Sequence, residues 1–239
     1  MRRILLLPNF LLFIFFSYSQ DSSVLSTQIG NAVNFYTKYI GENSGIYNGS
    51  EYVAYDFHIQ GHQYYEWNNP QPSSVKYDGI FYEKVPLAYD IVRDEVITTT
   101  YNDNVRIRLV SEKISYFSIQ DHFFERLIQD SSNKSVISTG FYERLYNGQM
   151  KVFAKRKKKI QEVVNTTEGD KQWFKEFDQF FVLKKNTYYA IQSKSDLFSL
   201  FDDKGKAVKK YLRKNKLKFK RQPESTILYA VKYYDQLKN

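Results

Sequence analysis

The chain has 239 residues, of which 42% are hydrophobic and 18% aromatic, and its formal net charge is +9. The absence of cysteine excludes disulfides, thiolate nucleophiles, cysteine-based metal sites and the lipid-bearing cysteine of bacterial lipoproteins. The apolar content is ample for a packed core and is not typical of intrinsic disorder.

The N-terminal residues have the three parts of a secretory signal peptide. Met1–Arg3 is a positive start, Ile4–Phe16 is an apolar stretch, and Ser17–Ser19 supplies small residues at a cleavage site before or just after Gln20. A membrane-spanning helix needs about 20 apolar residues, more than this stretch provides. We therefore expect residues 1–19 to be a signal peptide and the mature chain to be exported to the periplasm or beyond, without a transmembrane span or a lipid anchor.

Export changes which binding partners the positive charge predicts. Cleavage would lower the net charge only from +9 to +7, and the anions outside the cytoplasm are lipid headgroups, acidic glycans and acidic proteins rather than nucleic acid. Two basic stretches are candidates for peripheral contact with anionic surfaces: Lys155, Arg156, Lys157, Lys158 and Lys159, and the run from Lys204 to Arg221. The alternative for both is an ordinary solvated face.

Hydrophobic spacing predicts a helix followed by strands. Apolar residues three and four positions apart predict an amphipathic helix over 24–40. Alternation of apolar and polar residues then predicts half-buried strands over 53–59 and 105–109, and the second is the clearest strand pattern in the chain.

Turn sequences predict how the strands pair. Asn147-Gly148 is the strongest hairpin signal, because both central residues of the expected turn must take positive φ. Asn102–Asn104, Lys185-Asn186 and Asp78-Gly79 separate other pairs of strand-like runs. Strands that follow one another without intervening helices favour an antiparallel meander, open or curled into a partial barrel, over a parallel fold.

The C-terminal residues change to helical periodicity. Ser195-Asp196 offers a cap for a first helix, a second helix ends near Asn215, and Pro223 begins a third. We therefore predict an α+β fold, with an N-terminal helix and an antiparallel β domain over 20–194 and C-terminal helices over 195–239 packed on it.

Polar and aromatic residues that could form a binding site are scattered through the β region. Aromatic side chains in the predicted loop around Trp67 are suited to stacking on sugars or peptides. His58 and His62 lie four residues apart, but no metal-ligand signature accompanies them, so we expect neither a metal nor a cofactor. The candidate binding residues are His62, Tyr65, Trp67, Asp78, Asp90 and His122.

Catalytic signatures are missing from the sequence. It has no G-x-S-x-G elbow, no phosphate-binding glycine loop and no H-E-x-x-H motif. A carboxylate-based hydrolase would need two carboxyl groups about 5–10 Å apart, drawn from Asp78, Asp90 and Asp94 together with His62 or His122. Sequence spacing alone places none of them in one cleft, so we assign no catalytic residue.

Several aromatic and glycine motifs recur in an order that is typical of one group of proteins. The motifs are Tyr47-Asn48-Gly49-x-Glu51-Tyr52, Tyr77-Asp78-Gly79-x-x-Tyr82, Val85-Pro86-Leu87-x-Tyr89-Asp90, Gly140-Phe141-Tyr142-x-x-Leu145-Tyr146-x-Gly148 and the tail Tyr233-Tyr234-Asp235-x-Leu237. In these motifs the chain resembles a family of exported Bacteroidota proteins of unknown function. The resemblance covers most of the chain after the leader and implies an envelope location and one architecture, but no activity or site residue.

These observations favour an exported, non-catalytic envelope protein that binds an unidentified ligand or partner. The alternatives are an Asp- or Glu-dependent hydrolase of an envelope polymer, and a carrier of lipid-like ligands in the concavity of a curved sheet. A hydrolase predicts polar groups that converge in one cleft, whereas a carrier predicts a large apolar cavity beneath the sheet.

Overall fold

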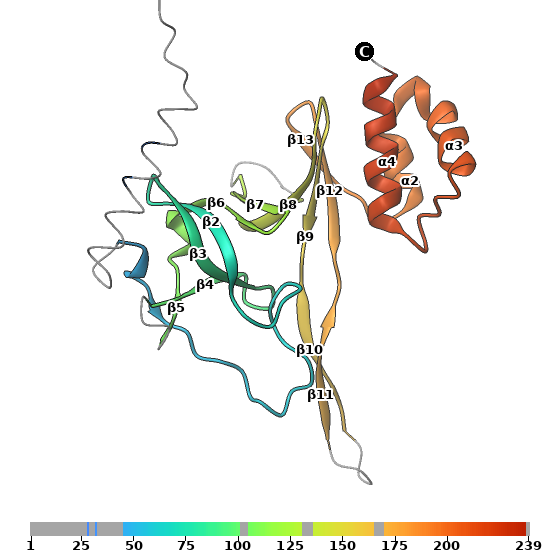
Figure 1. Cartoon of the computed structure of the whole chain (residues 1–239). Coiled ribbons are helices and arrows are strands. Elements are labelled where there is room, and N and C mark those ends of the chain that lie inside the picture. The colour runs from blue at the N-terminus through green and yellow to red at the C-terminus, as the bar shows by residue number, and fades with distance from the viewer. Residues whose placement is uncertain are drawn as a thin grey trace, which may run out of the picture.

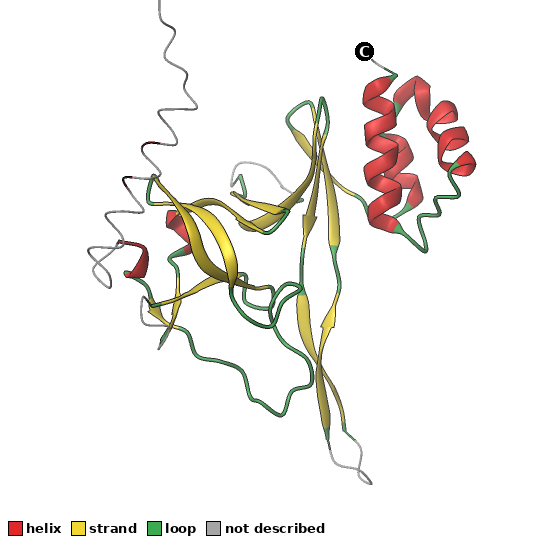
Figure 2. Ribbon diagram, viewed as in Figure 1, coloured by secondary structure: helices red, strands yellow, loops and turns green. Residues whose placement is uncertain are grey.

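The computed structural model describes residues 45–100, 105–130, 136–164 and 170–237, together with Gln28 and Ala32. Figures 1 and 2 show a strongly curved sheet, a long two-stranded ribbon and a group of C-terminal helices beside the ribbon. This α+β arrangement confirms the predicted fold class. The predicted signal peptide lies outside the described residues, as does the predicted helix over 24–40 except for Gln28 and Ala32, which are helical.

One antiparallel sheet dominates the described structure. Its strands are β1 (Ser50–Glu51), β2 (Gln71–Tyr77), β3 (Ile80–Asp90), β4 (Glu95–Thr99), β5 (Arg106–Arg108), β6 (Ile114–Ile119), β7 (His122–Leu127), β8 (Gly140–Asn147), β9 (Lys151–Lys155), β12 (Gln179–Lys184) and β13 (Thr187–Ala190). They lie in the order β1-β5-β4-β3-β2-β6-β7-β8-β9-β12-β13, so the sheet is open. β10 (Lys158–Val163) and β11 (Lys171–Glu176) pair separately and prolong β9 and β12 into the ribbon of Figure 1.

Two of the predicted hairpins have the expected turn geometry. Asp78 and Gly79 join β2 to β3 with φ of 49° and 79°, and Lys185 and Asn186 join β12 to β13 with φ of 49° and 61°. Positive φ at both central residues gives a turn whose twist matches that of the paired strands. β4 and β5 also pair as predicted, although their turn lies outside the described residues.

The hairpin between β8 and β9 forms for a different reason from the predicted one. The two strands pair, but Gly148 does not take positive φ. A Cβ atom on Gly148 would instead overlap the Tyr146 hydroxyl and the Asp235 carboxylate. Asp235 also accepts a hydrogen bond from the Met150 backbone N–H at 3.2 Å. Glycine is therefore required here by close packing against the C-terminal helix, not by a two-residue turn.

The strand predicted over 53–59 is wrong. Residues 52–59 run outside the sheet, and Val53 and Phe57 are 72% and 88% exposed. This segment crosses from β1 at the sheet edge to the ribbon, where Gln60 forms an isolated bridge with Trp173. Apolar alternation stabilises a strand only where a neighbouring strand and a core are within reach, and most of this segment has neither.

Aromatic side chains fill the inside of the curved sheet. Tyr65, Tyr89, Phe117, Phe124 and Phe141 are each no more than 8% exposed. The rings of Phe117 and Phe124 stack with centroids 4.9 Å apart, and Tyr89 meets Phe124 edge-on at 5.1 Å. The protein's own side chains thus occupy the concavity in which a lipid-like ligand was expected under the carrier alternative.

The C-terminal helices follow the prediction closely. They are α2 (Lys194–Ser199), α3 (Gly205–Lys214) and α4 (Pro223–Gln236). The cap of α2 is Ser193 rather than Ser195 or Asp196, and Ser193 and Asp196 exchange the two hydrogen bonds of a capping box. Proline occupies the first turn of α4, where its missing N–H has no intrahelical partner to lose.

One face of α4 packs the helices onto the sheet. Ile227, Val231 and Tyr234 form a single buried cluster with Val152 of β9 and Val182 of β12. No helix within the described ranges is long and apolar enough to cross a bilayer.

Candidate functional site

Two consecutive cations at the end of β9 lie inside the protein. Lys155 and Arg156 are only 4% and 8% exposed, and Lys158 is 8% exposed. Successive residues of a strand point to opposite faces of a sheet, so each of the first two cations has its own carboxylate partners. The predicted solvated basic cluster over 155–159 is therefore wrong for these three residues.

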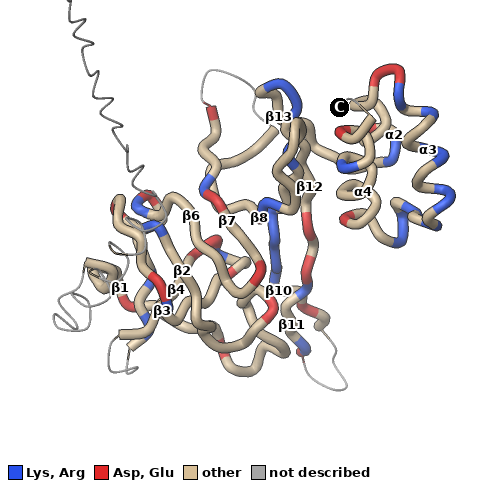
Figure 3. The backbone as a smooth tube through the Cα atoms, turned by 45° about the horizontal axis from the view of Figure 1, so that its top comes forward, with Lys and Arg blue, Asp and Glu red and all other residues tan. Residues whose placement is uncertain are grey.

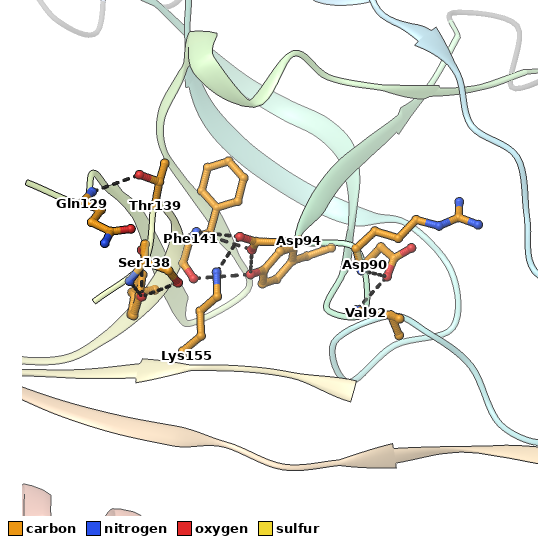
Figure 4. A network of polar contacts seen from close by, with 11 residues as sticks. Asp90, Val92, Asp94, Gln129, Ser138, Thr139, Phe141 and Lys155 are labelled. Carbon is orange, nitrogen blue, oxygen red and sulfur yellow. Dashed lines mark hydrogen bonds and ion pairs between the residues drawn. The ribbon is translucent and has the colours of Figure 1, made fainter. Parts of the chain in front are cut away.

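Lys155, the last residue of β9, pairs with Asp94 in the turn before β4. Its Nζ donates to Asp94 at 2.5 Å, and the Tyr89 hydroxyl donates to the same carboxylate at 2.5 Å (Figure 4). The Phe141 backbone N–H adds a 3.4 Å contact to Asp94, and the Lys155 Nζ lies 4.9 Å from the ring centre of Tyr142. Burial lowers the pKa of Lys155, and Asp94 opposes that shift. The pair ties the turn before β4 to β9, and the Phe141 contact ties it to β8.

Arg156 collects three carboxylates on the other face. Its Nε and Nη2 donate to Glu143 of β8 at 2.6 and 2.5 Å, and its Nη1 donates to Asp178 at 2.5 Å and to Glu224 of α4 at 2.6 Å. Burial by itself would lower the pKa of Arg156, but the carboxylates outweigh that effect and raise it. This cluster joins the sheet, the ribbon and the first turn of α4.

Lys158 serves the fold in the same way. Its Nζ donates to the backbone carbonyls of Tyr64 at 2.6 Å and His62 at 3.0 Å and pairs with Glu176 at 3.1 Å. Lys155, Arg156 and Lys158 are thus all engaged internally and are not accessible to an external anionic surface.

The structure brings together three of the six predicted binding residues. The His122 ring centre lies 5.1 Å from that of Tyr65 and 6.1 Å from that of Trp67, and His122 Nδ1 lies 2.6 Å from the Glu143 carboxylate. However, Tyr65 is only 8% exposed and packs in the aromatic core. The predicted stacking surface around Trp67 is therefore largely interior.

The other three predicted residues have side-chain partners outside this group or none, although Asp90 lies beside Tyr64 through a backbone bridge. Asp78 pairs with Lys113 at 2.8 Å on an exposed turn. Asp90 is fully buried, where burial raises its pKa, and accepts a hydrogen bond from Tyr52 at 2.9 Å. His62 Nδ1 is buried without a partner, and burial lowers the pKa of this histidine.

The convergence that a hydrolase requires is not present among the groups named for it. Asp78, Asp90, Asp94, His62 and His122 each contact a different set of partners. Within the described ranges, no group of three or more His, Cys, Asp or Glu side chains is arranged to hold a metal ion.

A cavity of about 900 Å³ opens where β12 and β13 meet the C-terminal helices. Its size lies within the usual range for small-molecule sites, which is about 300–1,000 Å³. Aromatic side chains form much of its wall, and the structure contributes polar groups from several segments. The aromatic lining residues are Tyr142, Phe180, Phe181 and Phe219, and the polar ones are Gln129, Ser138, Asp178, Gln179, Gln192, Ser193, Lys194 and Lys220.

Three glutamines give this β12 cavity its chemical character. Gln129 follows β7, Gln179 begins β12 and Gln192 follows β13, and all three are exposed. Gln129 bonds to Thr139 through its backbone N–H, as Figure 4 shows, and Gln192 bonds to Asp196 in the same way. Their side-chain carboxamides have no hydrogen-bond partner among the described residues, so each can both donate to and accept from a ligand.

The wall behind the glutamines is held in place by hydrogen bonds. The Tyr142 hydroxyl donates to the Ser138 carbonyl at 2.9 Å and accepts from the Ser138 N–H at 3.1 Å (Figure 4). Lys155 lies against the other side of the same ring. The Tyr142 ring, which is 1% exposed, is therefore a fixed part of the cavity's rear wall.

One carboxylate lines the β12 cavity, and it is already paired. Asp178, whose side chain is 30% exposed, accepts the short hydrogen bond from Arg156. Partial burial raises the pKa of Asp178, and Arg156 opposes the shift. Among the described residues, no second acidic side chain lines the cavity.

Sequence reasoning missed this cavity altogether. Its glutamines lie at 129, 179 and 192 and its last aromatic residue at 219, so no local motif connects them. Comparisons of the chain with protein-family models, curated proteins and solved structures find no match. The resemblance to exported Bacteroidota proteins stays a prediction, and the site is interpreted from its own chemistry.

The buried tyrosines predict a loss of stability at alkaline pH. Burial is the main cause that raises the pKa of Tyr65 and Tyr89 above 10, while tyrosines of the unfolded chain ionise near pH ~10. Stability is thus complete below pH ~10 and falls above it by about 1.4 kcal/mol per pH unit and tyrosine. The lowered pKa of Lys155 makes stability rise with pH instead, but this single group opposes two tyrosines. Urea unfolding should show a loss of about 2 kcal/mol between pH 9 and pH 11, and equal midpoints would contradict the assignment.

Proposed function

We propose that this protein is an exported, non-catalytic binding module of the cell envelope, and that the β12 cavity takes an oligosaccharide. The observation that carries the proposal is the set of three unengaged glutamine carboxamides around one aromatic cavity. They come from three separate segments, and only the folded sheet brings them to a common opening.

The chemistry of the cavity fits a hydroxyl-rich ligand. A sugar hydroxyl both donates and accepts hydrogen bonds, as does a carboxamide. The C–H faces of sugar rings pack on aromatic side chains, which here are supplied by the half-buried Phe180 and Phe219.

The arrangement of acids supports binding without hydrolysis. Glycoside hydrolysis uses two carboxyl groups about 5–10 Å apart on either side of the scissile bond. The cavity has Asp178 alone, and Arg156 engages it. The ligand is therefore held and not cleaved.

Glutamine replacement tests the proposal. We expect Gln129→Ala/Gln192→Ala to weaken oligosaccharide binding roughly 30-fold, because two hydrogen bonds of about 1 kcal/mol each are lost. Titration calorimetry with chitotetraose and with a muramidase digest of peptidoglycan supplies the probes. Gln172→Ala/Gln236→Ala is the matched control, since these two residues do not line the cavity. Equal affinities of the two double variants would refute the assignment of the cavity.

A further inference from the structure

A second cavity in the helical part has a different chemistry. It encloses about 440 Å³ between α2, α3 and the segment that follows α3. Within the described ranges no acidic residue lines it, and its cations are Lys194, Lys209, Arg213, Lys216, Lys218 and Lys220. Figure 3 shows the Lys and Arg positions along α3 and the loop after it. We call this cavity the basic groove.

The cations of the basic groove are free to meet an external anion. Within the described part of the chain, no carboxylate is paired with the five that belong to α3 and the loop after it. This distinguishes them from Lys155 and Arg156, whose charges are neutralised internally. Lysine and arginine side chains gathered without acidic neighbours attract phosphate groups.

The interior of the basic groove is apolar. Phe198 of α2, Leu212 of α3, and Leu217 and Phe219 of the following loop line it. Leu212 is 4% exposed, so this surface is continuous with the core between the helices. An occupant must therefore carry both an anionic group and a hydrocarbon part.

A buried hydroxyl at the groove has no partner. Thr226, in the first turns of α4, is 2% exposed, and its Oγ1 makes no hydrogen bond although it lines the groove. Buried polar groups in folded proteins are nearly always satisfied. The Thr226 hydroxyl thus points to a ligand that carries an acceptor at the depth where the apolar lining begins.

We propose that the basic groove binds one anionic phospholipid molecule. Its phosphate lies among the lysines, an ester carbonyl accepts from the Thr226 hydroxyl, and an acyl chain packs on Leu212 and Leu217. Charge complementarity, the apolar lining and the unsatisfied hydroxyl each account for one part of this ligand. The proposal is independent of the oligosaccharide site, although Lys194, Phe219 and Lys220 line both cavities.

Charge removal provides the first test. The full chain is titrated with dihexanoyl phosphatidic acid below its critical micelle concentration, and binding is followed by calorimetry. Lys209→Gln/Arg213→Gln/Lys216→Gln should weaken binding on the order of a hundredfold, at about 1 kcal/mol per charge.

A matched variant separates a site from general attraction. Lys206→Gln/Lys210→Gln/Lys214→Gln removes the same charge from the same helix at exposed positions that do not line the groove. We expect it to bind within about threefold of the wild type. Equal losses of lipid affinity in the two triple variants would overturn the assignment of the groove as a lipid site. Absence of binding by the wild type would overturn it as well.

Thr226→Val should raise the stability of the free protein and lower its affinity for the lipid. Removing a buried hydroxyl that has no partner should raise the thermal midpoint of the free protein. The same change should weaken phosphatidic acid binding about threefold to tenfold, because the lipid loses its donor. Unchanged lipid affinity would contradict the contact at Thr226. Inorganic phosphate is the last ligand to be titrated. If it binds as tightly as the lipid, the ligand of the basic groove is a free phosphate ion and not a phospholipid.

Discussion

Arg156→Met should strongly destabilise the protein. The substitution removes the cation shared by Glu143, Asp178 and Glu224 and leaves the Glu143 carboxyl group, at 5% side-chain exposure, without its arginine partner. Losing one partner of a buried ion pair costs about 3–5 kcal/mol, a large part of the 5–15 kcal/mol that is typical of a folded domain. Urea unfolding followed by tryptophan fluorescence measures the loss.

Two companion variants make the Arg156 experiment specific. Lys157→Met changes the next residue, whose side chain has no ion-pair partner in the described structure, and should stay within about 0.5 kcal/mol of the wild type. Arg156→Lys should be intermediate, because one ammonium cannot reproduce the forked contacts of the guanidinium. If Arg156→Met unfolds at the same urea concentration as Lys157→Met, the cluster does not hold the fold together.

Phe124→Ala should have the second large effect. Phe124 is fully buried and its ring meets those of Tyr65, Tyr89 and Phe117 at 4.9–5.2 Å. Truncation leaves a cavity inside the curved sheet and should cost about 3–5 kcal/mol. The control is Phe57→Ala, at a ring that is 88% exposed, where we expect less than about 0.5 kcal/mol.

The Phe124 result also bears on the carrier alternative. A tightly packed interior loses stability when a ring is removed, whereas a cavity that holds a ligand tolerates the loss. A cost below about 1 kcal/mol for Phe124→Ala would show that the concave face is loosely filled, and would return the lipid-like carrier to consideration.

Local signals predicted the parts of the fold that local chemistry determines. Asp78-Gly79 and Lys185-Asn186 turn the chain because their backbones adopt positive φ, and Pro223 starts a helix where its missing N–H does no harm. The strand over 53–59 failed because alternation does not tell whether a neighbouring strand is in reach. Gly148 shows the intermediate case, in which the hairpin was predicted and its cause was not.

The site was beyond sequence reasoning for a physical reason. Lys155 and Arg156 look like a solvated run, and only strand pairing brings Asp94 and Glu143 to opposite faces of β9 to neutralise them. Exposed glutamines form no recognisable sequence pattern, and these three stand out only because they line one cavity. The basic run from Lys204 to Arg221 was visible in the sequence, whereas the unpartnered Thr226 hydroxyl beneath it was not.

Amide-resolved NMR of the full chain with chitotetraose and with the peptidoglycan digest tests the central claim most directly. We expect chemical-shift changes concentrated at Ser138, Tyr142, Gln179 and Gln192, with the oligosaccharides recovered intact. Shifts centred on His122 and Trp67 instead, or the appearance of shorter saccharides during the titration, would contradict a non-catalytic oligosaccharide site in the β12 cavity.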